Sequence, residues 1–330
     1  MSVPTTMRAL EQTSLEGPRD LRLITDAPVP APGRGEVLIR VRAAGINFAD
    51  LSQARGVFGG GPRPPYLAGF EAVGEVVALG AQVNDPGLGT AVVGVGSGAF
   101  AEYAVLPAAA AMPVPAGWTA EQALGLVVNR AAALAALNPL GRLTPGETVV
   151  VHAAAGATGQ AAVRMAKHYG ATVIAAASPA KHETVRALGA DHVLDSLDAD
   201  LAAEVRRLTG GAGADLVLES AGGAAFAAAL ASAKPVTGRV VVYGLAGGEA
   251  AITNWDLVYR HQVHVIGLNL GTLSQAAPRV FGEVMSELSV LVAAGVLPPE
   301  RPVVHDLADG PEALAALESR GTVGKLALLP

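Results

Sequence analysis

Two patterns of apolar positions divide the chain, and the first is an alternation with a period of two. Between Glu36 and Ala43, the apolar side chains of Val37, Ile39 and Val41 alternate with mostly polar ones. This pattern is typical of an antiparallel strand that buries one face. Other short strands, separated by glycines, are expected within residues 7–45, 72–79, 91–94 and 99–105. The first part of the chain therefore predicts a small β barrel or sandwich.

The second pattern begins near residue 149, where short unbroken apolar runs alternate with helical segments. Continuous runs of this length are typical of parallel strands that are buried on both faces. The expected strands are Val149–His152, Val173–Ala177, His192–Leu194, Asp215–Glu219, Arg239–Tyr243 and Val263–Gly267, with helices that include Ala199–Leu208 and Ala224–Ala233. The alternation predicts an α/β fold with a doubly wound parallel sheet.

Helix signals mark the change from one pattern to the other. Residues 119–122 form a capping box, which opens an alanine- and leucine-rich helix that ends near Asn138-Pro139. A second long helix is expected from about Ala277 to Ala294, and residues 300–330 return to strand, helix and strand. We place the boundary between two domains at the capping box.

The first strand of the second part leads into a tight turn of small residues. Ala154, Gly156 and Gly159 occupy the small positions of a G-x-G-x-x-G turn, with alanine in place of the first glycine. Such a turn lets the backbone approach a pyrophosphate and lets the next helix pack closely on the strand. The helix start offers N–H groups and a partial positive charge to phosphates. By itself, this sequence is equally well explained by a turn whose small residues serve only close packing.

A second apolar strand, Thr172 to Ala177, completes a βαβ unit of about 30 residues, as dinucleotide sites require. An NAD site usually has Asp or Glu at the end of this strand, to bond the ribose hydroxyls. Here Ser178 ends the strand and Lys181 follows. A hydroxyl and a cation without a carboxylate favour NADPH over NADH. Alternatively, Ser178-Pro179 only begins the next helix.

Composition narrows the class of function. The chain has 330 residues, of which 51% are hydrophobic and 16% charged, so it is globular and long enough for two domains. Its net charge of −6 argues against a nucleic-acid surface. The longest apolar stretch, Ala123 to Leu137, contains Asn129 and Arg130, so we expect no membrane span. The lack of cysteine and of a signal peptide fits a cytoplasmic protein without thiolate metal sites.

Four motifs give the chain a family resemblance. They are Gly45-x-Asn47-x-x-Asp50, Gly69-Phe70-Glu71-x-x-Gly74, the turn Ala153 to Gly159 with Lys181, and Arg320-x-Thr322-x-Gly324-Lys325. With these motifs in this order, the chain resembles the zinc-free medium-chain dehydrogenases/reductases, and most of all the quinone oxidoreductase (zeta-crystallin-like) branch. The resemblance implies a Rossmann NADPH-binding domain, residues 123–295, inserted in a GroES-like β-rich substrate domain, residues 1–122 completed by 296–330.

Departures from the family pattern change the expected chemistry. Zinc alcohol dehydrogenases have Gly-His-Glu where this chain has Phe70 before Glu71, and their zinc sites also use cysteine, so we expect no metal and no ordinary alcohol oxidation. Glu71 is instead expected to bond neighbouring backbone. Related enoyl thioester reductases have a Tyr proton donor where this chain has Phe58, which cannot donate a proton. Ser196 replaces a frequent Tyr at the ribose phosphate, and Asn129 replaces a usual Thr near the nicotinamide.

The resemblance assigns roles to individual residues. Asn47 is expected to contact substrate or ribose, and Asp50 to orient its loop or pass a proton. Alternatively, both bond only their own backbone, as in Asx turns. Arg320 and Lys325 form a cationic wall near the cofactor or substrate, or are solvated surface charges. The expected cofactor-binding residues are Asn47, Asn129, Gly156, Ala157, Thr158, Gly159, Ser178, Lys181, Ser196, Tyr243, Gly244, Leu268, Asn269, Arg320 and Lys325.

These features predict an NADPH-dependent reductase that transfers a hydride to a quinone or to an activated alkene, such as an enone or enal. The cofactor supplies the chemistry, and the protein supplies position and exclusion of water. Two alternatives stay open: a reductase of an enoyl thioester or biosynthetic enone, and an NADPH-binding protein without enzymatic activity. The resemblance also implies a homodimer in which the edge strand Val263–Gly267 pairs with its copy.

Overall fold

The computed structural model describes residues 3–198 and 200–330, and the chain divides into two compact units. The first unit is Met1–Val128 with Pro299–Pro330, and the second is Asn129–Pro298. The chain thus divides after residues 128 and 298, whereas the sequence suggested boundaries after residues 122 and 295. That the units serve as a substrate domain and an NADPH-binding domain stays a prediction.

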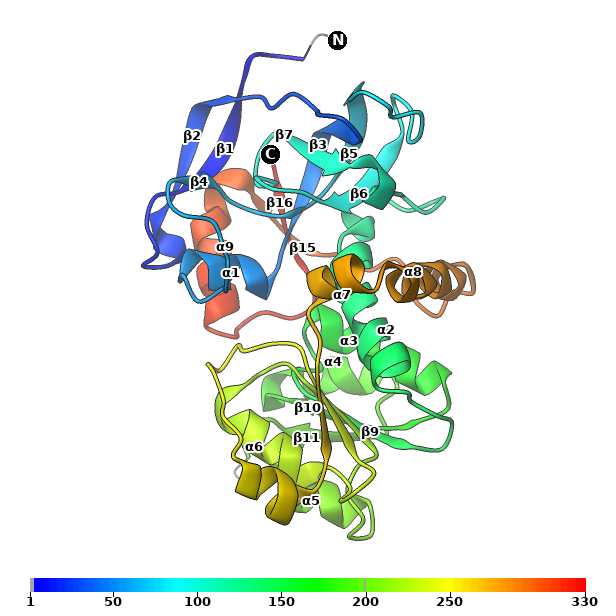
Figure 1. The fold of residues 1–330 in the computed structure, drawn as a ribbon. Helices are drawn as coiled ribbons and strands as arrows, with labels where there is room; N and C mark the ends of the chain where they lie inside the picture. The colour runs from blue at the N-terminus through cyan, green and yellow to red at the C-terminus, as the bar shows by residue number, and fades with distance from the viewer. Residues whose placement is uncertain (1–2, 199) are drawn as a thin grey trace. The chain divides into compact units, whose positions relative to one another are not determined.

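The first unit is rich in short strands (Figure 1). Its strands are β1 (Thr6–Gln12), β2 (Leu21–Pro28), β3 (Glu36–Ile46), β4 (Tyr66–Leu67), β5 (Glu71–Leu79), β6 (Ala91–Val95), β7 (Tyr103–Pro107), β8 (Met112–Pro113), β15 (Val303–Asp306) and β16 (Leu326–Leu329). One sheet has the order β15-β16-β3-β5-β6-β8, with β7 also paired to β3, and a smaller sheet has the order β2-β1-β4. Along β3, Val37, Ile39 and Val41 are buried and Arg42 is exposed, as the alternation predicts, but Leu38, at a position of the solvent side, is buried as well.

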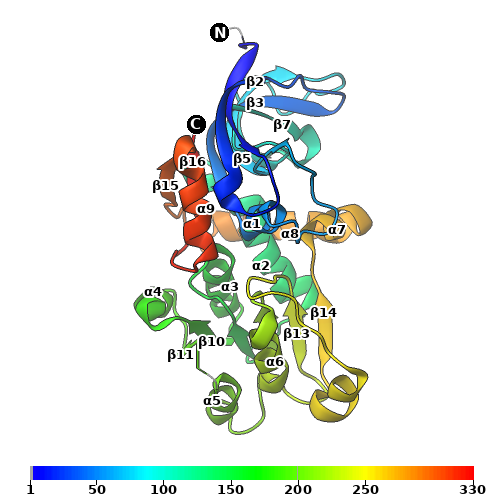
Figure 2. The ribbon, with the colours of Figure 1, turned by 90° about the vertical axis from the view of Figure 1, so that its left-hand side faces the viewer.

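The end of the chain completes the larger sheet of the first unit. Strand β16 pairs antiparallel with β3, with Leu326 opposite Ile46 and Ala327 opposite Gly45. Helix α9 (Gly310–Glu318) lies beside β15 and β16 (Figure 2), and α1 (Phe48–Ala54) directly follows β3. This pairing brings Lys325, which precedes β16, next to the turn that follows β3.

The second unit contains one six-stranded sheet, and all of its strands are parallel. Its order is β11-β10-β9-β12-β13-β14 (Figure 1), so the predicted doubly wound sheet is confirmed. The strands are β9 (Thr148–Val151), β10 (Thr172–Ala177), β11 (His192–Asp195), β12 (Leu216–Glu219), β13 (Arg239–Val242) and β14 (His264–Gly267). The helices are α2 (Ala131–Ala135), α3 (Ala157–His168), α4 (His182–Ala187), α5 (Leu201–Leu208), α6 (Gly223–Ser232), α7 (Leu270–Ala276) and α8 (Pro278–Ala293).

Successive residues of the central strands face opposite cores. In β9, Val149 and Val151 pack in a cluster with residues of α2, α3 and α8, while Val150 packs in a cluster with residues of α5 and α6. Because both faces are covered, the strands are apolar throughout. The parallel register also places the last residues of β9, β10 and β12 along one edge of the sheet.

The helix expected to start at the capping box is interrupted. Thr119 N donates to Gln122 Oε1 at 2.8 Å, as in a capping box, but Leu124 is extended and Gly125 has a φ of 83°. Continuous helix begins only at Leu126, with π-helical turns on either side of α2. Gly125 leaves the helix because its N–H donates to the Glu71 carboxylate instead. In α5, the expected residue Ala199 lies outside the described residues, and the helix begins at Leu201.

One stretch of the described residues, Glu121–Leu140, is long and apolar enough to cross a membrane. Of the most apolar 18 consecutive residues in this stretch, 67% are buried inside the protein. A core helix passes this test as readily as a membrane span does, so the stretch is weak evidence for a membrane.

Candidate active site and nucleotide site

A buried ion pair lies beside the turn that follows β3 in the first unit. Lys325 Nζ lies 2.6 Å from Glu71 Oε2 and 2.7 Å from Asn47 Oδ1. The side chain of Lys325 is 8% exposed and that of Glu71 is fully buried. Lys325 is therefore not the solvated surface charge of the alternative interpretation, whereas Arg320 is exposed. Whether either residue lies near a cofactor stays a prediction.

Glu71 connects three distant segments of the first unit. Its Oε1 accepts a hydrogen bond from Gly125 N at 2.6 Å, while its Oε2 binds Lys325 and Asn47. A Cβ on Gly45 would clash with Glu71 Oε2 and lie 2.9 Å from Lys325 Cε, so only glycine leaves room for the pair. Glu71 does bond backbone, but it is the backbone of a residue far along the chain. The ion pair with Lys325 could not be foreseen from sequence spacing.

Both the nitrogen and the oxygen of the Asn47 side-chain amide form hydrogen bonds within this network. Its Nδ2 donates to Gly45 O at 3.1 Å and to Glu71 Oε2 at 2.9 Å, and its Oδ1 accepts from Lys325. The amide hydrogens are thus used inside the unit. The expected contact with substrate or ribose stays a prediction.

Asp50 is a buried carboxyl with an unusual protonation. Burial raises its pKa to about 8 and nearby Glu71 adds to the rise, although a hydrogen bond from Asn47 N and the charge of Lys325 oppose it. Asp50 Oδ2 accepts that bond at 2.7 Å, which is the local contact of the Asx-turn alternative. Its Oδ1 has no hydrogen-bond partner among the described residues. At neutral pH this carboxyl therefore carries a proton, which a local capping role does not require.

Tyr66 is the phenol that the structure places near this carboxyl. Burial and the charge of Asp50 raise its pKa to about 12, so it stays a hydroxyl at neutral pH. The sequence offered no reason to connect the two side chains.

The glycine-rich turn of the second unit has the close packing that its sequence predicts. A Cβ on Gly159 would clash with Ala153 O and lie 2.6 Å from Ala154 Cα. Gly156 precedes α3 without a side chain to cap it, so the first N–H groups, including those of Ala157 and Thr158, have no acceptor within the helix. N–H groups at a helix start can bind a phosphate group, and that these do so stays a prediction.

Asn129 meets this turn although it is far from it in sequence. Its Nδ2 donates to Thr158 Oγ1 at 3.1 Å. The hydrogen bond brings together two of the residues that were predicted at the cofactor.

Three predicted residues surround the end of β10. Ser196 N donates to Ala177 O at 3.0 Å, and Lys181 N donates to Ser178 O at 2.9 Å. Burial lowers the pKa of Lys181, which is half-buried. Asp195 is paired with Ala177 in the register, so a carboxylate lies at the neighbouring strand end, where its Oδ1 accepts from Leu197 N at 2.9 Å. This carboxylate was not among the predicted site residues.

The other predicted residues follow β13 and β14 at the same edge of the sheet. Tyr243 N donates to Glu219 O at 2.9 Å, and Leu268 N donates to Val242 O at 2.8 Å. A Cβ on Gly244 would clash with Ser220 O. Asn269 caps α7, because its Oδ1 accepts from Thr272 N at 2.9 Å. Burial raises the pKa of Tyr243.

Glu219 organises this edge and was missed as a site residue. It is fully buried, and its Oε1 accepts from Ala221 N at 2.7 Å and from Gly222 N at 2.8 Å. His152, which directly precedes the glycine-rich turn, places its Nδ1 3.7 Å from the same oxygen. An acidic residue at a strand end before two glycines is the signal that could have found it.

Binding of a metal ion requires several side chains that together can hold it. Within residues 3–198 and 200–330, no three His, Asp or Glu side chains gather closely enough to hold a metal ion. Phe70 directly precedes Glu71, and the sequence has no cysteine.

Two family models match the chain. Residues 33–116 match the alcohol dehydrogenase GroES-like domain, and residues 157–289 match the zinc-binding dehydrogenase family. Among curated proteins, the human (Homo sapiens) synaptic vesicle membrane protein VAT-1 homolog is 31% identical over 98% of this chain and 86% of its own length.

Solved structures resemble the chain over nearly its whole length. A mycobacterial protein complexed with NADPH has a TM-score of 0.92 and 32% identity, covering 98% of this chain and 100% of its own. Quinone oxidoreductase from Pseudomonas syringae pv. tomato DC3000 has a TM-score of 0.90 and 30% identity, with coverage of 98% and 100%. CurK enoyl reductase has a TM-score of 0.89 and 28% identity, with coverage of 99% of both chains. The chain therefore belongs to the medium-chain dehydrogenase/reductase family of oxidoreductases, with Phe70 and no cysteine where its zinc-dependent members bind metal.

Proposed function

We propose that the protein is a cytoplasmic, NADPH-dependent reductase that passes a hydride to a quinone or to an activated alkene and needs no metal. The observation that carries the proposal is the corner at the end of β10. There Ser178, instead of a carboxylate, directly follows the last strand residue Ala177, and Lys181 follows within one turn of chain. A 2′-phosphate gains a charge-assisted hydrogen bond from Lys181 and a hydroxyl bond from Ser178 at such a corner.

The rest of the carboxyl edge fits a dinucleotide. The turn at Gly156 to Gly159 and the N–H groups of α3 suit a pyrophosphate. Asn129 and Thr158, already joined by a hydrogen bond, offer an amide and a hydroxyl beside that turn. Asp195 opposes a phosphate, because the hydrogen bond that its Oδ1 accepts from Leu197 N does not remove its negative charge. The proposal therefore requires that the bonds from Lys181 and Ser178 outweigh this repulsion. The relative solved with NADPH supports the same assignment.

The first unit suggests which class of acceptor is used. Phe70 replaces the histidine that would ligate zinc, and Glu71 already neutralises Lys325. No charged group in this network is left to polarise an alcohol, so the acceptor must itself be poor in electrons. Bound NADPH supplies the hydride. A quinone takes its protons from solvent, and an alkene can take one from the neutral Asp50 carboxyl through Tyr66 or water, since Phe58 has no proton to give.

The test is a panel of acceptors assayed by oxidation of NADPH. We expect turnover with a soluble quinone and with an unhindered enone, slower turnover with crotonyl-CoA, and none with a primary alcohol plus NADP⁺. Faster turnover with crotonyl-CoA than with quinones and enones would move the function to enoyl thioester reduction, the activity named for the similar CurK protein. Saturable NADPH binding without turnover of any acceptor would leave a binding protein without enzymatic activity.

A further inference from the structure

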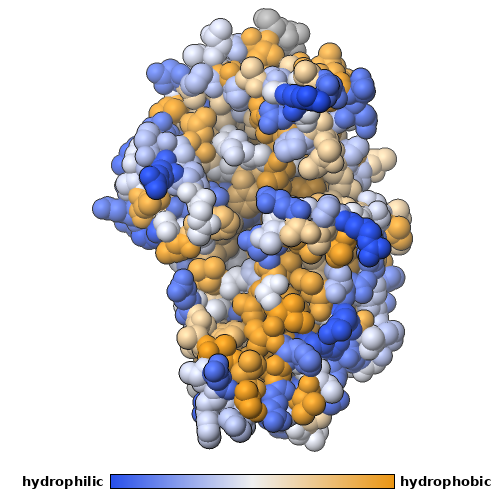
Figure 3. All heavy atoms as spheres, viewed as in Figure 1, coloured by the Kyte–Doolittle hydropathy of each residue, from blue (hydrophilic) through white to orange (hydrophobic). Residues whose placement is uncertain are grey.

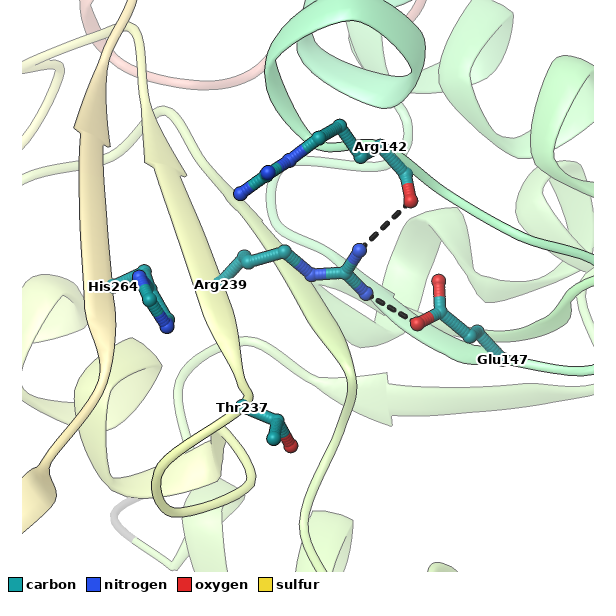
Figure 4. A pocket seen from close by; sticks show the side chains of 5 residues that line it. All are labelled: Arg142, Glu147, Thr237, Arg239 and His264. Atoms are coloured by element: carbon teal, nitrogen blue, oxygen red, sulfur yellow. Dashed lines mark hydrogen bonds and ion pairs between the residues drawn. The ribbon is translucent and has the colours of Figure 1, made fainter.

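A cavity lies at the edge of the parallel sheet where strands β13 and β14 begin (Figure 4), opposite to the edge that carries the glycine-rich turn. Its volume is about 370 Å³, and it is lined by Arg142, Glu147, Thr237, Arg239 and His264. Arg239 and His264 are the first residues of β13 and β14 and are adjacent in the register. Because the glycine-rich turn and Ser178 follow the carboxyl ends of these parallel strands, this cavity is separate from the proposed nucleotide site.

Arg239 is fixed in position at one wall of the cavity. Its Nη2 donates to Glu147 Oε1 at 2.5 Å, its Nη1 donates to Arg142 O at 2.8 Å, and its Nε donates to Asp215 O at 3.2 Å. The side chain is 10% exposed. Such a guanidinium is already oriented and loses little freedom when a ligand binds.

The charges that line the cavity do not cancel. Both oxygens of Glu147 already have partners, because Oε1 binds Arg239 and Oε2 accepts a hydrogen bond from Thr144 N at 2.8 Å. Both oxygens of nearby Asp215 also have partners: Oδ1 accepts from Lys234 Nζ at 3.2 Å, and Oδ2 accepts from Thr148 N at 2.9 Å. Arg142 forms no ion pair within the described part of the chain, and its side chain points away from Glu147, across β13 (Figure 4). Its positive charge is therefore left to face the cavity.

The backbone around the cavity is strained. Six non-glycine residues of the described chain have a positive φ, and three of them are here: Arg142 at 49°, Val236 at 73° and Gln262 at 51°. Val236, a β-branched residue, directly precedes Thr237 and donates its N–H to Gln262 O at 2.6 Å. Such a backbone conformation is unfavourable for a residue with a side chain and persists only where its surroundings hold it. This cluster of strained loops presents Thr237 and Arg142 to the same space.

We propose that this cavity binds the phosphate group of a small molecule, with Arg142, Thr237 and His264 as its donors and Arg239 as the fixed positive wall. A guanidinium, a hydroxyl and an imidazole N–H together satisfy three oxygens, and this number matches a phosphate better than a carboxylate, which has two. The volume leaves room for a substituent on the phosphate. The site does not depend on the proposed hydride transfer.

Isothermal titration calorimetry at constant ionic strength tests the site, with inorganic phosphate, glycerol 3-phosphate and acetate as probes. The variants are Arg142→Ala, Thr237→Val, Lys181→Ala and, as the matched control, Arg279→Ala, whose exposed arginine lies in the same unit. We expect both phosphates to bind the wild type, the Arg279→Ala protein and the Lys181→Ala protein alike. Loss of Arg142 should weaken binding about tenfold, as the loss of one charge-assisted hydrogen bond does.

Each opposite outcome overturns the proposal. If Arg142→Ala and Thr237→Val bind phosphate as the wild type does, the cavity is not the site. If Lys181→Ala alone abolishes binding, the phosphate occupies the nucleotide corner. If acetate binds as tightly as phosphate, the cavity is only a weakly cationic surface. If only inorganic phosphate binds, the substituent has no room and the ligand is the free ion.

Discussion

Lys325 and Glu71 are 254 residues apart in sequence, yet their charged groups lie 2.6 Å apart inside the first unit. Both side chains are almost completely buried, and Asn47 bonds to both. A buried ion pair adds little to stability compared with apolar residues, but removing one partner leaves an uncompensated charge. Each of the two buried charges is therefore stabilised mainly by the other charge and not by solvent.

Lys325→Met is expected to destabilise the protein by about 3–5 kcal/mol, because it leaves the Glu71 carboxylate buried without a cation. Denaturant unfolding measures this. The double variant Lys325→Met/Glu71→Gln should recover part of the loss, since no buried charge remains. Lys167→Met is the control, because that lysine forms a more exposed ion pair with Asp191 and should cost at most about 1 kcal/mol. Equal losses for Lys325→Met and Lys167→Met would contradict the buried pair.

Stability is expected to fall as the pH rises toward 8, because of Asp50. Its pKa is 3.8 in the unfolded chain and about 8 in the folded protein, so between these values only the folded state holds the proton. Unfolding then releases a proton, and the free energy of unfolding decreases with rising pH throughout this window. Asp50→Asn keeps an acceptor for Asn47 N but does not titrate.

Denaturation midpoints measured from about pH 5 to about pH 8 separate this contribution from other groups. The wild type should lose more stability across the range than Asp50→Asn does. Parallel curves for the two proteins would show that Asp50 is ionised in the fold.

The corner at Ser178 and Lys181 should give NADPH a preference over NADH of at least about tenfold, or ~1.4 kcal/mol. Lys181→Ala should weaken the binding of NADPH while leaving NADH nearly unaffected, and Ser178→Asp should reverse the preference. Fluorescence titration with both cofactors measures these constants. If Lys181→Ala weakens both cofactors alike, this corner does not bind the phosphate.

Activity is expected to be independent of zinc, because Phe70 stands where a ligand would be and the chain has no cysteine. Elemental analysis of the purified protein should find no stoichiometric zinc, and incubation with a chelator should leave the rate unchanged. One tightly bound zinc per chain would refute this.

The edge strand β14 is expected to pair with its copy in a homodimer. It is the last strand of the sheet, and Val265 on it is 39% exposed. Apolar side chains also gather over the second unit on the face shown in Figure 3, and exposed ones in that unit include Trp255 and Tyr259. An open apolar edge is an aggregation hazard unless it is covered.

Light scattering at micromolar concentration should therefore give the mass of a dimer. Val265→Lys should shift the equilibrium to monomer, whereas Val290→Lys, on the exposed face of α8, should not. A wild-type monomer, or equal effects of the two variants, would count against pairing through β14.

The parts of this protein that follow from local pattern were predictable, and those that depend on distant pairing were not. The runs at Val149 and Val173 became β9 and β10, because an apolar run between turn residues has few other structures available. The helix expected after Thr119 was interrupted because Gly125 bonds to Glu71, a contact across 54 residues. Asn129 was predicted near the cofactor through resemblance alone, and its contact with Thr158 depends on tertiary packing. Glu219 was overlooked because it looked like an ordinary strand residue.

The three hydrogen-bonded partners of Glu71 also determine how the inserted unit is attached. Gly125 lies just before the point where the chain leaves the first unit, and Lys325 lies on the segment that follows its return. Both segments are fastened to one buried carboxylate, so the ends of the insertion are anchored independently of what lies between them. We therefore expect the first unit to keep its fold when residues 129–298 are replaced by another domain, provided that Gly45, Glu71, Gly125 and Lys325 are retained as a set.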